Sequence, residues 1–394
     1  MPENLRARLK RIRNSGRISG RDSFENSVNH NDKNSESVSQ PDASWPLWHS
    51  AGFKTLKREL CKELSFPLPA AFSGALPILI PDLARIRNLK NSQNSLRVPS
   101  AEELLFFDLE TTGLSGGAGT IAFLAAFGRF DTPANSAAGK NAVIRITQYL
   151  LLDYPSECDF IGQVLKEFAP IKRNLPVVVS YNGKCFDSQI LKNRCLMNGT
   201  ATPEYYHADL LHPARRLWKR VLPDCSQKTV ETEVLHLDRS GDVSGALAPE
   251  IWFSFLKSDD NRELLGVCDH NVRDIQGLAS IFFALEEIAV DPLGCCKKFI
   301  IDPEALALTW KAAVRNNEHC RSYTETGEML LKNAAENGYP RAAIVAAIDA
   351  EWKLKDPALA LNYTKYALGN KDIPESLKPG LEKRLARLER KTKN

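Results

Sequence analysis

The sequence predicts an α/β protein with a mixed β-sheet, followed by a C-terminal region made only of helices. From about residue 102, short apolar segments alternate with longer segments whose apolar residues recur at helical spacing. After Pro303 only the helical spacing remains. We therefore expect one domain over residues 100–295, with a five-stranded sheet in the order β-β-β-α-β-α-β, and a helical domain over residues 303–392.

The first three expected strands follow one another with only a turn and a loop between them. They are residues 104–109, 120–130 and 142–152, separated by a turn at 115–119 and a loop at 131–140. We expect these strands to be antiparallel and two later strands to extend the sheet in parallel. The remaining expected elements are a helix at 157–168, a strand at 177–181, a helix at 188–197, a strand near 205–210, helices within 213–235 and at 250–257, and a long helix at about 263–289.

The N-terminal part of the chain differs in composition from the rest. Residues 1–44 are expected to be a disordered basic tail, because residues 22–44 are polar and cannot bury enough apolar surface to become ordered. The basic residues of the tail suit either contact with phosphate backbones or simple solvation. Order is expected to begin near Trp45, with residues 45–99 as a lead-in that packs on the next domain and residues 53–64 as a short helix.

The helical C-terminal region contains a weak internal repeat. The segments 332–337 and 365–370 resemble each other and lie 33 residues apart, close to the period of tetratricopeptide (TPR) repeats. An ordinary helical bundle is the alternative, because stable solenoids prefer at least three repeats. Such a TPR-like region would dock a protein partner or lengthen a path for nucleic acid.

Composition excludes several classes of protein. The nine cysteines include no Cys-x-x-Cys pair, so neither a disulfide framework nor a zinc site is indicated. No apolar run approaches the roughly 20 residues needed to span a membrane, and the start of the chain lacks the apolar segment of a signal peptide. We expect a soluble, cytoplasmic protein with no membrane partner. The net charge of +4 says little about nucleic acid by itself.

Four acidic residues in three separated segments carry most of the functional information. Asp108 and Glu110 end an apolar strand at positions i and i+2, so their side chains project from the same face. Two carboxylates so close repel each other and usually indicate a bound cation. Asp187 follows the fourth strand, where capping of the next helix is the alternative role. Asp274 lies in the long helical pattern.

These segments resemble the motifs of a known nuclease family. The run Asp108-Leu-Glu-Thr-Thr-Gly resembles the first motif of the DEDD 3′→5′ exonucleases, whose domain has the ribonuclease H-like fold. The run from Tyr181 to Asp187, Tyr-Asn-Gly-x-x-Phe-Asp, is similar to the second motif of the proofreading domains of family-B DNA polymerases. His270-Asn-x-x-Asp274 occupies the place of the third motif. The stretch from His207 to Asp274 looks like the YprB-type proteins, which are ribonuclease H-like with a TPR-like tail.

The resemblance implies a metal-dependent nuclease, most directly a 3′→5′ exonuclease acting on RNA or single-stranded DNA. Two Mg²⁺ or Mn²⁺ ions would be held by oxygen ligands at one end of the sheet. The implied ligands are Asp108, Glu110, Asp187 and Asp274. The alternatives are a catalytically silent nucleic-acid-binding adaptor and a structure-specific endonuclease of the same fold.

His270 departs from the family pattern. The histidine-type exonucleases place their histidine five residues before the last Asp, and the tyrosine-type place a tyrosine four before it. This chain has a histidine at the tyrosine spacing. His270 is expected to take the proton from the attacking water, whereas orientation of water or substrate by Asn271 and ordinary polar contacts of His270 are the alternatives.

Other polar and aromatic residues near the motifs are expected to line a substrate groove. Aromatic rings there would stack on bases, and arginines would bind phosphates. Tyr181 in the core, and carboxylate pairing by the arginines, including Arg239, are the alternatives. For His207 and Asp209, a third metal position and structural support both remain open. The expected substrate-binding residues are Thr111, Thr112, Tyr181, Asn182, Phe186, Asn271, Arg215 and Arg216.

Overall fold

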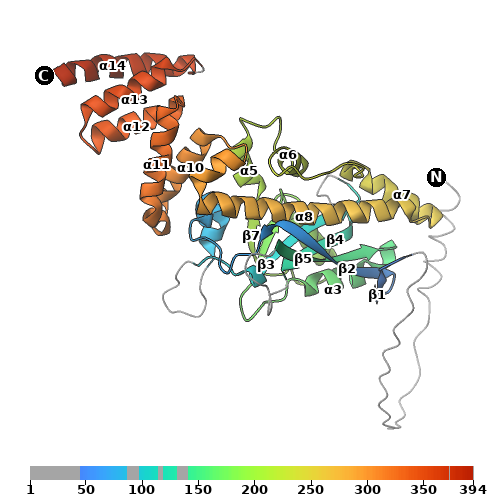
Figure 1. Ribbon diagram of the computed structural model, residues 1–394. Coiled ribbons are helices and arrows are strands. Elements are labelled where there is room, and N and C mark those ends of the chain that lie inside the picture. The colour runs from blue at the N-terminus through green and yellow to red at the C-terminus, as the bar shows by residue number, and fades with distance from the viewer. Residues whose placement is uncertain (1–44, 87–96, 114–118, 131–140, 372, 394) are drawn as a thin grey trace, which may run out of the picture. The chain divides into compact units, whose positions relative to one another are not determined.

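The computed structural model describes residues 45–86, 97–113, 119–130, 141–371 and 373–393. These residues form one mixed sheet of seven strands in the spatial order β1-β2-β5-β4-β3-β6-β7, covered by helices and followed by a helical C-terminal region (Figure 1). The strands are β1 His49–Gly52, β2 Thr55–Pro67, β3 Leu104–Thr111, β4 Ala122–Phe130, β5 Asn141–Leu151, β6 Val177–Ser180 and β7 Tyr206–Asp209.

The centre of the sheet agrees with the prediction. Strands β3, β4 and β5 are antiparallel neighbours, and β6 and β7 extend the sheet in parallel beside β3. The predicted order β-β-β-α-β-α-β is therefore confirmed, with the helices α3 and α4 in the predicted places. Because β3 lies between β4 and β6, the carboxylates that it carries lie in the interior of the sheet rather than at an edge.

Strand β2 corrects one prediction. Residues 53–64 were expected to be helical, but β2 pairs antiparallel with β5 from Thr55, opposite Leu151, to Glu63, opposite Val143. Its leucines recur every four residues, as in a helix, but pairing with the backbone of β5 stabilises the extended conformation. With β1, this strand raises the number of strands from the predicted five to seven.

Helices pack on both faces of the sheet. They are α2 Leu76–Leu79, α3 Glu157–Lys166, α4 Asp187–Met197, α5 Leu211–Trp218, α6 Gln227–Glu233, α7 Ala248–Ser258, α8 Arg262–Val290 and α9 Pro292–Lys298. Successive side chains of β3 enter different cores, because side chains alternate along a strand. Phe106 packs edge-on against Phe130 and Phe282 of α8, whereas Phe107 stacks on Phe127 of β4.

The long helix α8 lies close against the sheet (Figure 1). Gly128 of β4 makes this approach possible, because a Cβ atom there would lie 2.6 Å from the side chains of both Ile144 and Ile275. The end of β2 and the segment after it pack against the C-terminal half of α8, where Phe66 stacks on Phe283 and Phe72 packs edge-on against Phe282. In addition, the backbone N–H of Ser73 donates a hydrogen bond to Glu286.

The region after Pro303 is helical, as predicted. It comprises α10 Pro303–Asn316, α11 Thr324–Glu336, α12 Pro340–Trp352, α13 Pro357–Gly369 and α14 Lys378–Lys393. Consecutive helices pack against each other. The two repeat segments lie at the C-terminal ends of α11 and α13, where Asn370 donates a hydrogen bond to the carbonyl of Gly338. The TPR-like assignment stays a prediction.

Several expectations concern segments outside the described residues. These are the basic tail at 1–44, most of the turn at 115–119 and the loop at 131–140. Within the described part of the chain, none of the helices combines the length and the apolar character needed to cross a membrane.

Two glycine variants test the close approach of α8. Gly128→Ala is expected to lower the free energy of unfolding by about 1–3 kcal/mol, because the added methyl group forces Ile144 or Ile275 to move. Gly162→Ala, in α3, is the matched control. No atom lies within 4 Å of its added Cβ, so helix propensity should raise stability by about 0.5–1 kcal/mol. Denaturant unfolding measures both, and equal stability of the two variants would contradict the packing described.

Candidate active site

Strand β3 presents Asp108 and Glu110 on one face of the sheet. Both side chains are half-buried and alternate with the buried Phe107 and Leu109. In register, Asp108 lies opposite Ala126 and Glu110 opposite Leu124 of β4. The apolar neighbours fix the strand, so the two carboxylates are held side by side at a defined position.

Asp187 reaches the same place from the turn that follows β6. It is the first residue of α4 and is buried, with 5% of its surface exposed. Asn182 has a left-handed backbone (φ 64°), and Gly183 follows it. A Cβ atom at Gly183 would collide with Ser180 and lie 2.9 Å from Oδ2 of Asp187. The Asn-Gly pair is therefore needed for the turn to close against the carboxylate.

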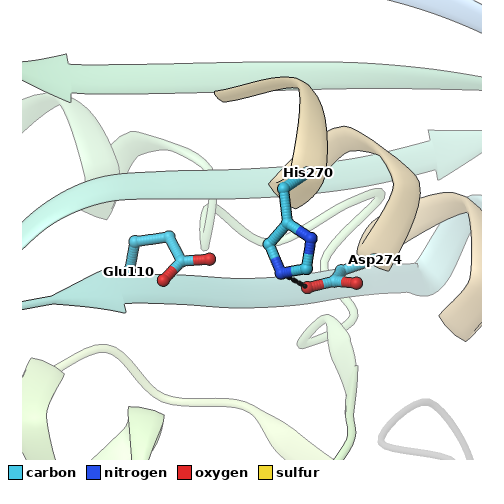
Figure 2. Close-up of side chains that lie close together, drawn as sticks. All are labelled: Glu110, His270 and Asp274. Atoms are coloured by element: carbon cyan, nitrogen blue, oxygen red, sulfur yellow. Dashed lines mark ion pairs between the residues drawn. The ribbon is translucent and has the colours of Figure 1, made fainter. Parts of the chain in front are cut away.

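Helix α8 supplies the third part of the site. His270 and Asp274 lie one turn apart, with 3.2 Å between Nε2 of His270 and Oδ2 of Asp274. Figure 2 shows both side chains directed from α8 towards Glu110 on β3. One possible ligand atom from each of these three residues lies within 4.8 Å of the other two. The three residues could thus share one metal ion.

The electrostatics of Asp108 indicate that the four acidic residues of the motifs are close neighbours. Burial, followed by the charges of Asp187, Asp274 and Glu110, raises the pKa of Asp108 well above its usual value. A hydrogen bond of 2.6 Å from Nδ2 of Asn271 opposes this rise. Asp108 thus lies near enough to the other three carboxylates for their charges to act on it.

Glu110 and Asp187 experience the same conditions. Burial, and then the charges of Asp274 and Asp187, raises the pKa of Glu110 well above its usual value. Burial raises the pKa of Asp187 to about 7. Within the described chain, no donor forms a hydrogen bond with the Glu110 carboxylate. Among the described residues, no lysine or arginine forms an ion pair with Asp108, Glu110 or Asp187. Such a set of hard oxygen ligands fits a divalent cation such as Mg²⁺ or Mn²⁺.

A buried chain of hydrogen bonds connects Asp108 to β2. Nε of Arg58 donates to Oε1 of Gln148 at 2.6 Å, and Nε2 of Gln148 donates to Oδ1 of Asn271 at 2.7 Å. Asn271 in turn donates to Asp108. We call Arg58, Gln148 and Asn271 the amide chain. All three are buried, with 5%, 0% and 0% of their surfaces exposed.

Donor and acceptor are fixed in each hydrogen bond of the amide chain. A guanidinium group has no acceptor, so Gln148 must turn its oxygen to Arg58 and its NH₂ group to Asn271. Asn271 must then turn its own NH₂ group to Asp108. Sequence reasoning included Asn271 but missed Arg58 and Gln148. The only available signal was a glutamine within the apolar strand of residues 142–152.

A second buried network surrounds Asp274. Arg239, which was considered as a phosphate binder, forms ion pairs with Glu231, Asp242 and Asp274. It is 9% exposed, so the carboxylate-pairing alternative is the one observed. Gly277 of α8 leaves the space for Glu231, whose carboxylate occupies the position that a Cβ atom would take.

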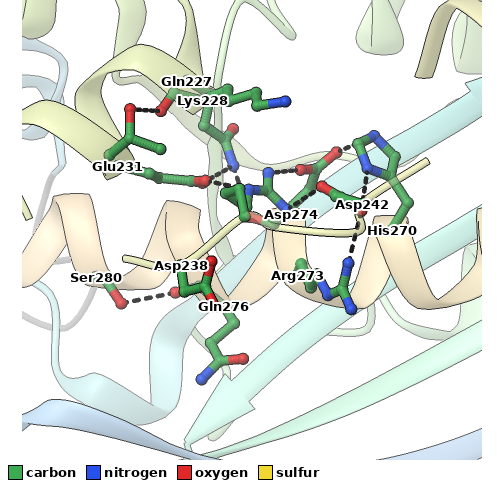
Figure 3. A network of polar contacts seen from close by, with 12 residues as sticks. Gln227, Lys228, Glu231, Asp238, Asp242, His270, Arg273, Asp274, Gln276 and Ser280 are labelled. Atoms are coloured by element: carbon green, nitrogen blue, oxygen red, sulfur yellow. Dashed lines mark hydrogen bonds and ion pairs between the residues drawn. The ribbon is translucent and has the colours of Figure 1, made fainter. Parts of the chain in front are cut away.

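This network also holds His270. Its Nδ1 lies 3.0 Å from Oδ1 of Asp242, so each ring nitrogen faces a carboxylate oxygen (Figure 3). Asp242 also pairs with Arg273. The side chain of Asp242 is 1% exposed and that of His270 13%. The ring is therefore fixed in orientation, and Asp242 is a further residue that sequence reasoning missed.

The predicted substrate-binding residues divide between several places. Tyr181, Asn182 and Arg215 line one groove of about 460 Å³ together with Gln227. This groove adjoins the site, because Gln227 donates a hydrogen bond to the backbone carbonyl of Asp274 at 2.7 Å. The hydroxyl of Tyr181 donates to the carbonyl of residue 225 at 2.6 Å, and burial raises the pKa of Tyr181.

The other predicted substrate residues lie elsewhere. Arg216 lines a separate cavity, which α10 also borders. The Thr111 hydroxyl donates to the carbonyl of residue 113, and the Thr112 hydroxyl accepts from the N–H of residue 121, so both hold the end of β3. Phe186 is half-buried and packs against the core beneath α4.

His207 and Asp209 support the turn before Asp187. Asp209 accepts hydrogen bonds from the backbone N–H groups of Asn182 and Lys184. His207 bonds Ser180 through Nε2 at 2.7 Å, and burial lowers the pKa of His207 to about 4. These contacts favour structural support over a third metal position.

Comparison with known proteins agrees with this fold. Residues 105–285 match the family model described as the RNase_H superfamily. This match agrees with the order of the strands, which is that of a ribonuclease H-like fold.

One curated relative is the Bacillus subtilis (strain 168) protein named "Uncharacterized protein YprB". It is 32% identical over 249 residues, which cover 61% of this chain and 57% of the relative. The chain therefore spans little more than half of that relative's length.

Likeness to solved structures is low. Escherichia coli exonuclease I in complex with a dT13 oligonucleotide gives a TM-score of 0.26 at 19% identity, over 41% of this chain and 42% of the other. The family B DNA polymerase from Pyrobaculum calidifontis gives 0.31 at 15% identity, over 54% and 29%. Scores this low carry no argument about function.

The amide chain predicts the effect of an isosteric change. In Gln148→Glu the new carboxylate can only accept, so Asn271 would turn its NH₂ group away from Asp108. We expect Mn²⁺ affinity, measured by isothermal titration calorimetry, to fall about 10- to 100-fold, as when a hydrogen-bond partner of a metal ligand is lost. The control is Gln163→Glu, on the surface of α3. Equal affinity in both variants would mean that the amide chain does not act on the site.

The raised carboxylate pKa values predict how stability depends on pH. Without metal, Asp187 titrates near pH 7 in the folded protein, against 3.8 when unperturbed. The folded state therefore binds more protons between these values, and the free energy of unfolding falls as the pH rises from about 4 to about 7. Thermal melting in EDTA should show this fall, and Asp187→Asn should reduce it. Mn²⁺ should raise the melting temperature more at pH 8 than at pH 5.5. If Mn²⁺ raised the melting temperature equally at both pH values, Mn²⁺ would not be competing with protons for Asp187, and this residue would not be a metal ligand with a raised pKa.

Proposed function

We propose that this protein is a metal-dependent nuclease that hydrolyses phosphodiester bonds, acting as a 3′→5′ exonuclease on RNA or single-stranded DNA. One observation carries the proposal. Carboxylates from β3, α4 and α8 form one group, in which the charges of Asp187 and Asp274 raise the pKa values of both Asp108 and Glu110. Such a group is unfavourable without cations, and phosphodiester hydrolysis is a reaction that cations in this position assist.

The proposed metal ligands are those expected from the sequence. Asp108 and Glu110 would hold a pair of Mg²⁺ or Mn²⁺ ions together with Asp187 and Asp274. When bound, the ions stabilise charge on the attacking and leaving oxygens of the phosphodiester and make a water molecule more acidic.

The protein's own groups orient the reactants. Asn271 donates to one oxygen of Asp108, which leaves the other oxygen for a cation. His270 lies beside Glu110 and Asp274, and its Nδ1 would donate to Asp242. Its Nε2 faces Oδ2 of Asp274, so it would accept a proton from an attacking water once the Asp274 carboxylate binds a cation instead. Asp242 supports this role by fixing the plane of the ring, so His270 is the proposed general base.

The adjoining groove suits the end of a single strand. Arg215 is exposed there and offers a cation to a phosphate. Asn182 presents its exposed side chain on the same groove. Because Tyr181 uses its hydroxyl within the protein, only its ring is available to a base.

Substitution of the ligands tests the proposal. Asp108→Asn and Glu110→Gln keep the side-chain shape but remove a negative charge. With Mn²⁺ and 5′-labelled RNA or DNA, each variant should lower the cleavage rate by more than about 100-fold. Loss of a residue that only hydrogen-bonds to a metal ligand lowers activity by up to about 100-fold, and loss of a ligand itself should cost more. The matched control is Glu233→Gln, an exposed carboxylate of α6, which should cleave normally.

The pattern of products separates the alternatives. A ladder that shortens from the 3′ end supports the exonuclease, and a single internal cut indicates an endonuclease. If the wild type binds oligonucleotide but leaves it intact with either metal, the adaptor replaces our proposal. Circular dichroism would verify that each variant is folded.

A further inference from the structure

A tryptophan is exposed at the end of α12, far along the chain from the motifs. Trp352 has 57% of its surface exposed, and the neighbouring Ile348 and Leu354 are 38% and 65% exposed. The Nζ atoms of Lys355 and Lys391 lie 5.8 and 5.9 Å from the centre of the Trp352 ring. We call these five residues the Trp352 surface. It joins the end of α12 to the end of α14.

Positive charge exceeds negative charge beside this surface. Glu351 is buried and pairs with three cations of α14: Arg384, Arg387 and Lys391. One carboxylate cannot neutralise three cations. The side chains of Arg387 and Lys391 remain 39% and 50% exposed, so they also face solvent.

Two nearby acids have other partners. Asp349 pairs with Lys311 and Lys353. Asp356 caps α13 by accepting a hydrogen bond from the backbone N–H of Leu359. Within the part of the chain that the structure describes, no carboxylate forms an ion pair with Lys355. The surface therefore keeps a positive potential that suits an anionic partner.

An exposed ring between cations is typical of a site for single-stranded nucleic acid. The ring stacks on a base without regard to sequence, and the cations bind the phosphates on either side. If the lysines served only to cover the ring, most of it would be buried, but more than half is accessible. The charge and the open ring thus favour a strand of nucleic acid over an uncharged apolar partner.

We propose that the Trp352 surface is a second nucleic-acid contact, in which Trp352 stacks on a base and Lys355 and Lys391 bind flanking phosphates. The choice of nucleic acid over an acidic protein rests on the proposed nuclease function. The contact itself requires no cleavage. It would hold a strand at a place other than the groove of Tyr181 and Arg215.

Binding without turnover tests this proposal. Full-length protein in EDTA is titrated against fluorescein-labelled oligo(U) and oligo(dT) of about 20 nucleotides, followed by fluorescence anisotropy. Trp352→Ala should weaken binding by about 5- to 100-fold, the range for loss of one stacked base. Trp352→Phe should restore most of the affinity. The double variant Lys355→Ala with Lys391→Ala should reduce the slope of log affinity against log salt by about 1.4.

The controls match each change in chemistry. Phe53→Ala removes an aromatic ring that is 65% exposed beside β2, and Lys332→Ala removes an exposed lysine of α11. Both should bind like the wild type, and thermal melting should show all variants folded.

Two results would overturn the proposal. One is unchanged oligonucleotide affinity in Trp352→Ala. The other is Trp352-dependent binding of a polyglutamate peptide without binding of oligonucleotide, which would assign the surface to an acidic protein. If Trp352→Ala binds oligonucleotide normally and cleaves it with Mn²⁺, the Trp352 surface is wrong and the nuclease proposal stands.

If oligonucleotide binding depends on Trp352 but the wild type does not cleave with Mn²⁺, the Trp352 surface is supported and the nuclease proposal is wrong.

Discussion

The carboxylates of β3, α4 and α8 repel one another in a part of the protein from which water is largely excluded, and much of the surrounding structure compensates for that repulsion. Burial and mutual charge raise the proton affinity of Asp108 and Glu110. Two contacts compensate for part of this negative charge: Asn271 donates a hydrogen bond to Asp108, and Arg239 forms an ion pair with Asp274. Among the residues that the structure describes, none donates a hydrogen bond to Glu110 or forms an ion pair with it, so its negative charge stays uncompensated. A cation-binding site is therefore a property of the whole arrangement rather than of one residue.

The two buried networks differ in what they fix. The amide chain sets the direction in which Asn271 presents its NH₂ group, because it begins at a guanidinium that can only donate. The network of Arg239 sets the positions of Asp274 and His270 by charge. Both networks meet on α8, where residues 270, 271 and 274 occupy adjacent turns. The site residues of α8 are thus held in position from two directions, by β2 and β5 through the amide chain and by the segment after α6 through Arg239 and Asp242.

Local patterns were sufficient to predict the central elements, because the apolar runs of β3, β4 and β5 and the helical spacing in α8 report directly on burial. The candidate ligands could be chosen because Asp108 ends an apolar run, Asp187 follows one and Asp274 lies in the helical pattern, each within a motif that resembles those of the exonuclease family. Arg58 was not, because its role depends on β2 pairing with β5, and the leucine spacing of that segment fits a helix equally well. Asp242 lies in an irregular segment, so only the tertiary structure brings it to His270.

The position of Arg58 shows that the site depends on a residue outside the range matched by the family model. The family match begins at residue 105 and includes every acidic ligand candidate, yet the guanidinium that orients Gln148 is supplied by β2, well upstream. A polypeptide trimmed to the matched boundaries would retain all the recognisable motifs while leaving Oε1 of the buried Gln148 without its donor. Strand β2 is thus an integral part of the ribonuclease H-like unit and not an appendage to it.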